Sequence, residues 1–190
     1  MYLLRILLPC LISSPLLAAP EFVHCYDFGC KSTQQLRYSD DHWRRIRGLF
    51  DNPALDRDEE KQAIRRAVAL MESISGELSG THLDKAGNYP GYDLPRQMDC
   101  IDESTNTFQY LLALEELNLL KWHRVDLKQR RIVWFITHWT ATISEVGTDA
   151  RYAVDSWYRD NGEMPYLQPL EDWKRKRDWP VAYNPELAVH

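Results

Sequence analysis

The most regular pattern in the chain is a helical repeat of apolar residues between Asp56 and Gly80. Asp56 and Glu59 have the spacing of a capping box, and Gly80 is a residue at which helices commonly stop. The pattern therefore predicts a long amphipathic helix. Its apolar face is made by Ile64, Ala67, Val68, Met71, Ile74 and Leu78.

A shorter helix is predicted before this one. Ser39 can cap it, and Asn52-Pro53 ends it. Trp43, Ile46 and Phe50 recur between them at helical spacing. These three side chains make the apolar stripe by which this helix would pack against the rest of the chain.

A third helix begins where a loop rich in glycine and proline, residues 81–99, gives way to a periodic run. The run should extend to about Leu119, and it places Cys100 in the first helical turn. Loops of this length in compact domains are often functional. The helical face is made by Ile101, Thr105, Phe108 and Leu112.

Beyond this helix the pattern changes to one typical of strands. The runs 131–136, 138–145 and 151–157 are rich in β-branched and aromatic residues, and residues 147–149 supply a turn between the last two. Sequential strands joined by a short turn pair antiparallel. We therefore expect an α+β fold, with the N-terminal helices and the Cys100 helix packed on an antiparallel sheet. The proline-rich stretch after residue 162 is expected to wrap the surface.

Composition and charge narrow the classes of protein. A chain of 190 residues with 44% hydrophobic residues suits one domain, and a net charge of -5 gives no general attraction for nucleic acid. Residues 1–18 resemble a secretory signal peptide, with Arg5 ahead of an apolar stretch and small residues at its end. We expect residues 19–190 to form a single exported domain, periplasmic or secreted, with no membrane span after cleavage.

If residues 1–18 are removed on export, Cys10 is lost and Cys25, Cys30 and Cys100 remain. Three cysteines cannot all pair with one another in an oxidising compartment. Cys25 and Cys30 can close a small disulfide loop in which Gly29 tolerates the tight backbone. That pairing leaves Cys100 as the free thiol. A zinc site of His24, Cys25 and Cys30 is the alternative, but it lacks the usual paired spacing and an obvious fourth ligand.

The free cysteine stands where a thiol can be activated. A helix N-terminus carries partial positive charge and unpaired N–H groups, which favour a thiolate at Cys100. The alternative is a small buried core residue, since cysteine is often fully buried. His138 and Asp155 on the two following strands supply a base and a group that orients it. His123 is a rival base, without a strand partner of that kind.

The residues Asp99-Cys100-Ile101-Asp102, then His138-Trp139, then Tyr152-Ala153-Val154-Asp155 resemble the transglutaminase-like cysteine protease superfamily. The chain is most similar to the bacterial transglutaminase-like cysteine proteinases, which include periplasmic proteases that cut adhesins. The resemblance implies a papain/transglutaminase-like fold, with Cys100 as nucleophile, His138 as base and Asp155 as its orienter. One departure is Met98, because a glycine often precedes the Asp-Cys pair in this superfamily.

The expected function is an exported cysteine peptidase or amidase. It would cleave a peptide or isopeptide bond of an envelope or surface protein through an acyl-thioester at Cys100. A second interpretation is a catalytically silent module that uses the same region to bind an envelope protein. An acyl-transferring transglutaminase is a third, and it differs only in whether an amine or water accepts the acyl group.

Two further assignments concern the start of the Cys100 helix. Gln97 could donate to an oxyanion, or it could be an ordinary loop residue. Asp99 and Asp102 could hold a calcium ion with carbonyl groups of the 81–98 loop, or they could simply cap the helix. The resemblance also implies calcium, because some of the adhesin-cutting proteases need it. The chemistry itself requires no cofactor.

Overall fold

The computed structural model describes residues 19–88, 95–133 and 135–175 of the chain. The predicted signal peptide, residues 1–18, lies outside the described residues, as do residues 176–190 of the stretch expected to wrap the surface. Two antiparallel sheets and four helices make up the described part. In chain order they are β1 (Glu21–Tyr26), β2 (Ser32–Arg37), α1 (Asp40–Gly48), α2 (Arg57–Ser79), α3 (Cys100–Glu116), β3 (His123–Val133), β4 (Ile136–Glu145), β5 (Arg151–Asp155), β6 (Tyr166–Pro169) and α4 (Leu170–Lys174).

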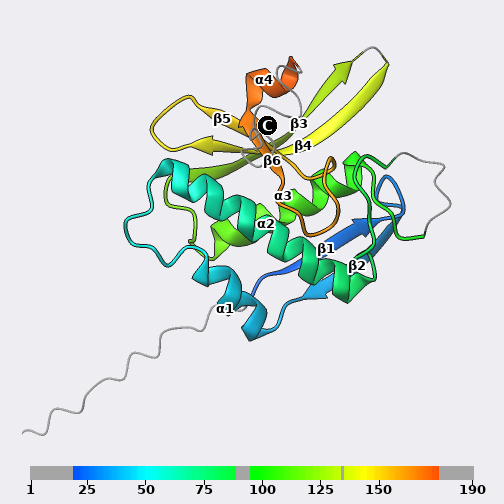
Figure 1. The fold of residues 1–190 in the computed structure, drawn as a ribbon, viewed down its shortest axis with the longest axis horizontal. Helices are drawn as coiled ribbons and strands as arrows, with labels where there is room; N and C mark the ends of the chain where they lie inside the picture. Colours follow the sequence, from blue (N-terminus) through cyan, green and yellow to red (C-terminus); the bar gives the residue numbers. More distant parts are fainter. Residues whose placement is uncertain (1–18, 89–94, 134, 176–190) are drawn as a thin grey trace, which may run out of the picture.

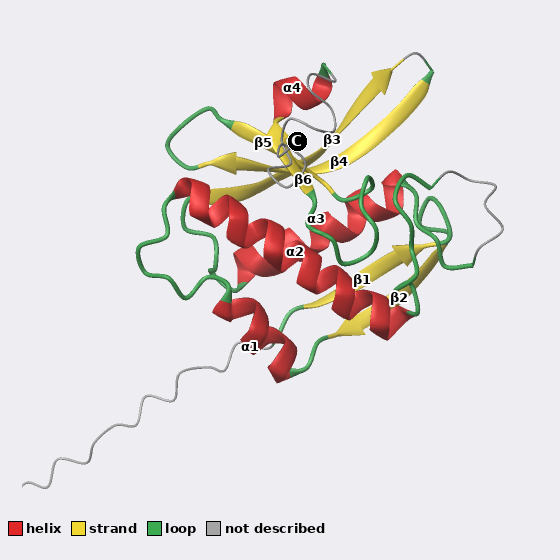
Figure 2. Cartoon of the chain, viewed as in Figure 1, coloured by secondary structure: helices red, strands yellow, loops and turns green. Residues whose placement is uncertain are grey.

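The helix that carries Cys100 is central to this arrangement. Figure 1 shows α3 between the four-stranded sheet and the β1–β2 hairpin, with α2 lying alongside it. Helices and sheets are thus segregated along the chain, as in an α+β fold (Figure 2). The predicted α+β class is confirmed at this level. Among the described helices, none combines the length and the apolar character that a membrane crossing requires.

The three predicted helices are confirmed as helices, and their caps explain why. The Cys100 helix ends at Glu116, however, and Ile101 and Leu112 of its predicted apolar face are exposed. Ser39 accepts a hydrogen bond from the His42 backbone at the start of α1. Asp56 and Glu59 form the expected capping box at the start of α2, and Gly80 ends that helix in the left-handed conformation. Because these caps satisfy backbone groups that a helix end leaves unpaired, they fix both ends of the long helix.

The predicted antiparallel sheet is also confirmed, with the strand order β3-β4-β5-β6. Strand β3 starts at His123, earlier than predicted. The sequence pattern hides this start, because the register with β4 shifts between Asp126 and Gln129 and breaks the alternation of apolar and polar positions. Strand β5 stops at Asp155 and is therefore shorter than the predicted strand 151–157. The short elements β6 and α4 lie in a stretch expected to wrap the surface, yet Leu170 and Trp173 are buried there.

The main core lies where α2, α3 and the β1–β2 hairpin meet. Trp43, Tyr38 and Phe22 pack together there, with Phe22 also edge-on to Tyr110 of α3. Removing this apolar surface from water is the main favourable contribution to folding. The hairpin was not predicted as such; the expected Cys25–Cys30 loop is its turn. This packing holds α3 against the sheet and fixes where Cys100 stands.

Candidate active site

Cys100 occupies the first position of α3, as the sequence predicts. Asp99 is the N-cap, and its Oδ1 accepts the backbone N–H groups of Ile101 at 2.9 Å and Asp102 at 3.0 Å. In return the Asp102 carboxylate accepts the Asp99 backbone N–H at 3.2 Å. This reciprocal capping box fixes the backbone on both sides of the cysteine. Cys100 itself remains partly exposed, with a free thiol.

The β1–β2 turn is anchored to the same helical turn. Cys25 and Cys30 are joined in a disulfide, and the Asp102 carboxylate accepts the backbone N–H groups of Phe28 and Cys30. Four consecutive turn residues, 27–30, have positive φ angles. Because three of these are not glycine, the turn depends on the disulfide and on Asp102 to hold it.

His138 and Asp155 lie on neighbouring strands and are directly bonded. His138 Nε2 is 2.7 Å from Asp155 Oδ2, and the same oxygen accepts the indole N–H of Trp173 at 2.7 Å. The imidazole also lies against the rings of Trp157 and Tyr158, with centroids 4.9 Å and 5.0 Å away. Both the histidine and the aspartate are buried. Their surroundings therefore hold the imidazole in one orientation, with Nδ1 left for another partner.

The thiol of Cys100 lies beside the backbone of β4 at His138. Its Sγ is 3.9 Å from the carbonyl oxygen of Thr137, and the backbone N–H of Trp139 also acts on it. These two backbone groups flank His138 in the chain. The Nδ1 atom of His138 is buried and has no hydrogen-bond partner among the described residues. The structure thus places the Cys100 thiol against the backbone on either side of His138, whose imidazole is bonded to Asp155.

The electrostatic surroundings of the thiol differ from those expected at a helix N-terminus. Burial, together with the negative charges of Asp99 and Asp155, raises the pKa of the Cys100 thiol to about 11. The N–H of Trp139 acts in the opposite direction. The helix terminus alone therefore does not produce a thiolate at neutral pH, and ionisation requires a base to take the proton.

Gln97, the oxyanion candidate, is buried in the loop before α3. Its Nε2 donates to the Leu83 carbonyl at 3.2 Å, and its Oε1 accepts from the Lys85 backbone at 3.1 Å and from the Asn88 amide. These contacts hold the 83–88 loop rather than a substrate. The backbone N–H of Cys100 itself acts on the sulfur. It is therefore the better-placed donor for an oxygen that develops negative charge beside the thiol.

Asp99 and Asp102, the expected calcium ligands, both accept backbone N–H groups. Burial raises the pKa of the Asp102 carboxyl to about 6, although the N–H groups of Cys30, Asp99 and Phe28 oppose this shift. The observed bonds favour the capping role that the sequence equally allowed. Calcium binding by these residues stays a prediction.

The alternative zinc site was expected to use His24, Cys25 and Cys30, and the structure shows the partners of all three. Cys25, Cys30 and Asp102 bring ligand atoms within 4.8 Å of one another, but the two sulfurs are joined in the disulfide. They therefore cannot act as thiolate ligands. His24 is buried, and its Nε2 is bonded to the Thr81 hydroxyl at 3.1 Å. The structure favours the disulfide reading.

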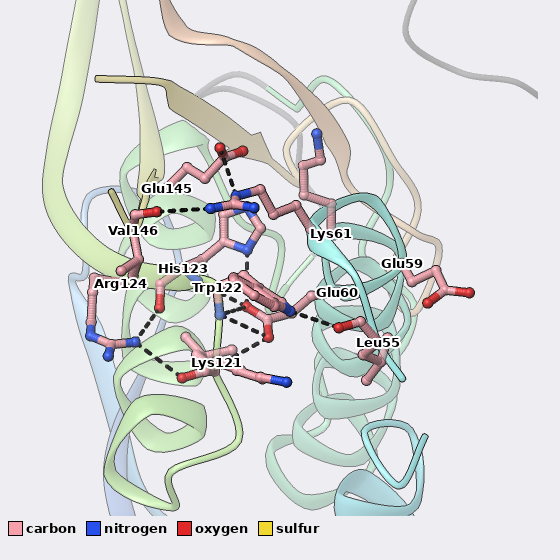
Figure 3. A network of polar contacts seen from close by, with 12 residues as sticks. Leu55, Glu59, Glu60, Lys61, Lys121, Trp122, His123, Arg124, Glu145 and Val146 are labelled. Carbon is pink, nitrogen blue, oxygen red and sulfur yellow. Dashed lines mark hydrogen bonds and ion pairs between the residues drawn. The ribbon is translucent and has the colours of Figure 1, made fainter. Parts of the chain in front are cut away.

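The rival base, His123, has a structural partner. Its Nδ1 is 2.9 Å from Glu60 Oε1, and the same carboxylate accepts the backbone N–H groups of Lys121, Trp122 and His123 (Figure 3). Both His123 and Glu60 are buried. The pair ties the start of β3 to α2, and the thiol is not part of it.

Two residues near the site were not singled out from the sequence. Trp173 of α4 bonds Asp155, but it lies in a short helix without a periodic pattern. Lys128 of β3 reaches the Thr105 hydroxyl on α3, at 2.7 Å. A lysine in a strand with an irregular register gives no sequence signal for such a contact.

We compared the chain with known proteins by sequence and by structure. No protein-family model, no curated protein and no solved structure matches it.

Proposed function

We propose that this protein is a cysteine hydrolase of the transglutaminase-like type, as the resemblance of its motifs implies. The observation that carries the proposal is the relation of His138 to its neighbours. Its Nε2 is bonded to Asp155, its buried Nδ1 has no partner among the described residues, and the thiol of Cys100 lies against the adjoining backbone. A nucleophile, a base and an orienting carboxylate are the parts of a covalent hydrolase.

The acylation step uses His138 as a base. The imidazole takes the thiol proton as the Cys100 sulfur bonds to the carbonyl carbon of a peptide or isopeptide bond. His138 then gives that proton to the leaving amine as the C–N bond breaks. The Asp155 carboxylate holds the imidazole in the useful tautomer and stabilises its positive form. An acyl-thioester and a free amine result.

Deacylation runs through the same groups. Water gives a proton to His138 while its oxygen bonds to the carbonyl carbon, the C–S bond breaks, and the proton returns to the Cys100 sulfur. If a primary amine takes the place of water, the product is a new amide, which is the transglutaminase reaction. The same residues serve both outcomes.

The proposed substrate is a protein of the cell envelope or the cell surface. A disulfide between Cys25 and Cys30 is compatible with a compartment outside the reducing cytosol. Together with the signal-peptide pattern of residues 1–18, this supports a periplasmic or secreted enzyme.

The test is to incubate the mature protein with an envelope protein extract and to identify new protein N-termini by mass spectrometry. The wild type should generate new termini, and the Cys100→Ser and His138→Ala variants should not. A biotinylated primary amine in the same reaction reports acyl transfer. The same termini with Cys100→Ser would contradict the proposal.

A catalytically silent binding module is the second candidate. The raised pKa of the Cys100 thiol, about 11, favours it, because a protonated thiol is a poor nucleophile. In that case the wild type and Cys100→Ser should capture the same envelope protein, and neither should cleave it.

A further inference from the structure

A lysine of β3 lies beside the candidate nucleophile. Lys128 Nζ donates to the Thr105 hydroxyl at 2.7 Å and lies 5.8 Å from the centre of the Trp139 ring. Thr105 follows Cys100 by little more than one helical turn, and the backbone N–H of Trp139 acts on the Cys100 sulfur. The lysine is therefore held between the helix that carries Cys100 and the strand residue whose backbone N–H acts on the thiol.

Lys128 is a half-buried cation whose bonded partner is neutral. Lys61 and Lys85 each pair with a carboxylate, at 2.7 Å and 2.5 Å, whereas the ion pairs found within the described residues do not include Lys128. Burial lowers the pKa of its ammonium, while the charge of Cys100 acts to raise it. Taking an ammonium out of water without a counter-ion is unfavourable. An anion that entered the site would remove that penalty.

We infer that Lys128 is a specificity-determining residue, whose ammonium binds an acidic side chain of the substrate next to the bond that Cys100 attacks. This rests on the proposed function. The carboxylates of Asp99 and Asp155 place negative charge near the thiol, which repels an acidic substrate. Lys128 supplies the attraction, and the Thr105 hydroxyl, which accepts from its ammonium, holds it in place.

The first experiment measures the charge at the thiol and does not depend on turnover. The mature protein is alkylated at Cys100 with iodoacetate, which is anionic, and with iodoacetamide, which is neutral, and the ratio of the two rates is taken. Lys128→Met should lower this ratio about threefold or more, and Lys128→Arg should preserve it, because a unit charge within several ångströms acts selectively on the anion. High salt should reduce the difference.

Lys121→Met is the matched control. The Lys121 ammonium also lies over a tryptophan ring, at 4.9 Å from the centre of Trp122, but it precedes β3 and is roughly 20 Å along the strand direction from Lys128. This variant should leave the ratio unchanged. An unchanged ratio in Lys128→Met, with unfolding temperatures showing that the variant is folded, overturns the inference.

The second experiment tests the substrate class with two short peptidyl chloromethyl ketones that differ only in an aspartate or an asparagine beside the reactive carbon. The wild type and Lys128→Arg should label faster with the aspartate reagent, and Lys128→Met should lose that preference. Equal labelling of the wild type by both reagents overturns the inference.

His138→Ala separates this inference from the proposed function. Without the base, Cys100 should react more slowly with both iodoacetate and iodoacetamide, but the ratio of the two rates should stay the same. If His138→Ala reacts like the wild type, the proposed function fails while the ratio still decides the role of Lys128.

Discussion

Asp155 is the residue on which the orientation of His138 depends. One of its oxygens accepts from both His138 Nε2 and Trp173 Nε1, each at 2.7 Å. Asp155→Asn keeps the shape but replaces one oxygen with an N–H donor, which favours the wrong tautomer of the imidazole. We expect kcat/KM to fall by at least about 100-fold while the unfolding temperature changes little.

Trp173→Phe is the comparison for this prediction. It removes the indole N–H but keeps an aromatic ring against His138, whose centroid lies 5.6 Å from that of Trp173. We expect a smaller loss of kcat/KM than for Asp155→Asn. Equal activity of Asp155→Asn and the wild type would remove Asp155 from the mechanism.

A second group of residues predicts how stability depends on pH. Glu72, Asp84 and Glu103 are buried together behind the start of α3, with Asp102 adding further negative charge. Burial raises the pKa of Glu72 to about 8 and that of Asp84 to about 7, and it raises the pKa of Glu103 well above its ordinary value. The folded protein therefore keeps protons that the unfolded chain releases near pH 4.

For groups of this kind, the stability is fully present below the unfolded pKa and is lost as the pH rises through the folded pKa. We expect the unfolding temperature to fall by roughly 5 °C or more between about pH 6 and pH 9. Glu103→Gln removes one titrating group and should flatten this fall. Circular dichroism melts at several pH values measure it, and an unfolding temperature that stays constant or rises over this range would refute the assignment.

The disulfide of the β1–β2 hairpin, which packs against α3, leads to a prediction about stability. Cys25→Ser with Cys30→Ser opens the disulfide, leaving only hydrogen bonds, chiefly those to Asp102, to hold a turn of four residues with positive φ angles. We expect the free energy of unfolding to fall by about 2 kcal/mol, as for a short disulfide loop. We also expect activity to fall, since the same aspartate caps the Cys100 helix. Denaturant titration measures the first effect, and unchanged stability would show that the turn holds itself.

The elements found from the sequence are those with local signals. The caps at Ser39 and Asp56 and the stop at Gly80 are properties of a few adjacent residues, and these helices were predicted correctly. The β1–β2 hairpin was missed because its turn is not a standard two-residue type and depends on Asp102, far away in the sequence. Strand β6 and helix α4 are too short to show a period.

The same distinction applies to the candidate site. The placement of Cys100 at a helix start follows from the local pattern around Asp99, and the order of His138 and Asp155 on adjacent strands followed from the strand-turn-strand pattern. The contacts of Trp173 and Lys128 did not, because each comes from a separate element that only the folded chain brings to the site. The raised pKa of Cys100 likewise depends on burial and on Asp155, which no local motif records.

For the molecule as a whole, the position of α3 between the sheet and the hairpin links folding to the site (Figure 1). Its first turn carries Cys100, and the Asp102 carboxylate in that turn accepts backbone N–H groups of the hairpin turn. If Asp99 and Asp102 hold a calcium ion as well as capping the helix, calorimetry should show calcium binding to the mature protein, and a chelator should lower its unfolding temperature. If they only cap the helix, neither effect should appear.

The most direct test of the account is the pH dependence of alkylation at Cys100 by iodoacetamide, in the wild type and in His138→Ala. If His138 takes the thiol proton, the imidazolium offsets the burial of the charge, and the wild type should react with a midpoint below about 8.5, the pKa of a free thiol. In His138→Ala the midpoint should move upward, because no imidazolium then offsets the burial and the neighbouring carboxylates, which raise the pKa of the thiol. Identical profiles for the two proteins, or a wild type that reacts only at high pH, would contradict the proposed catalytic pair.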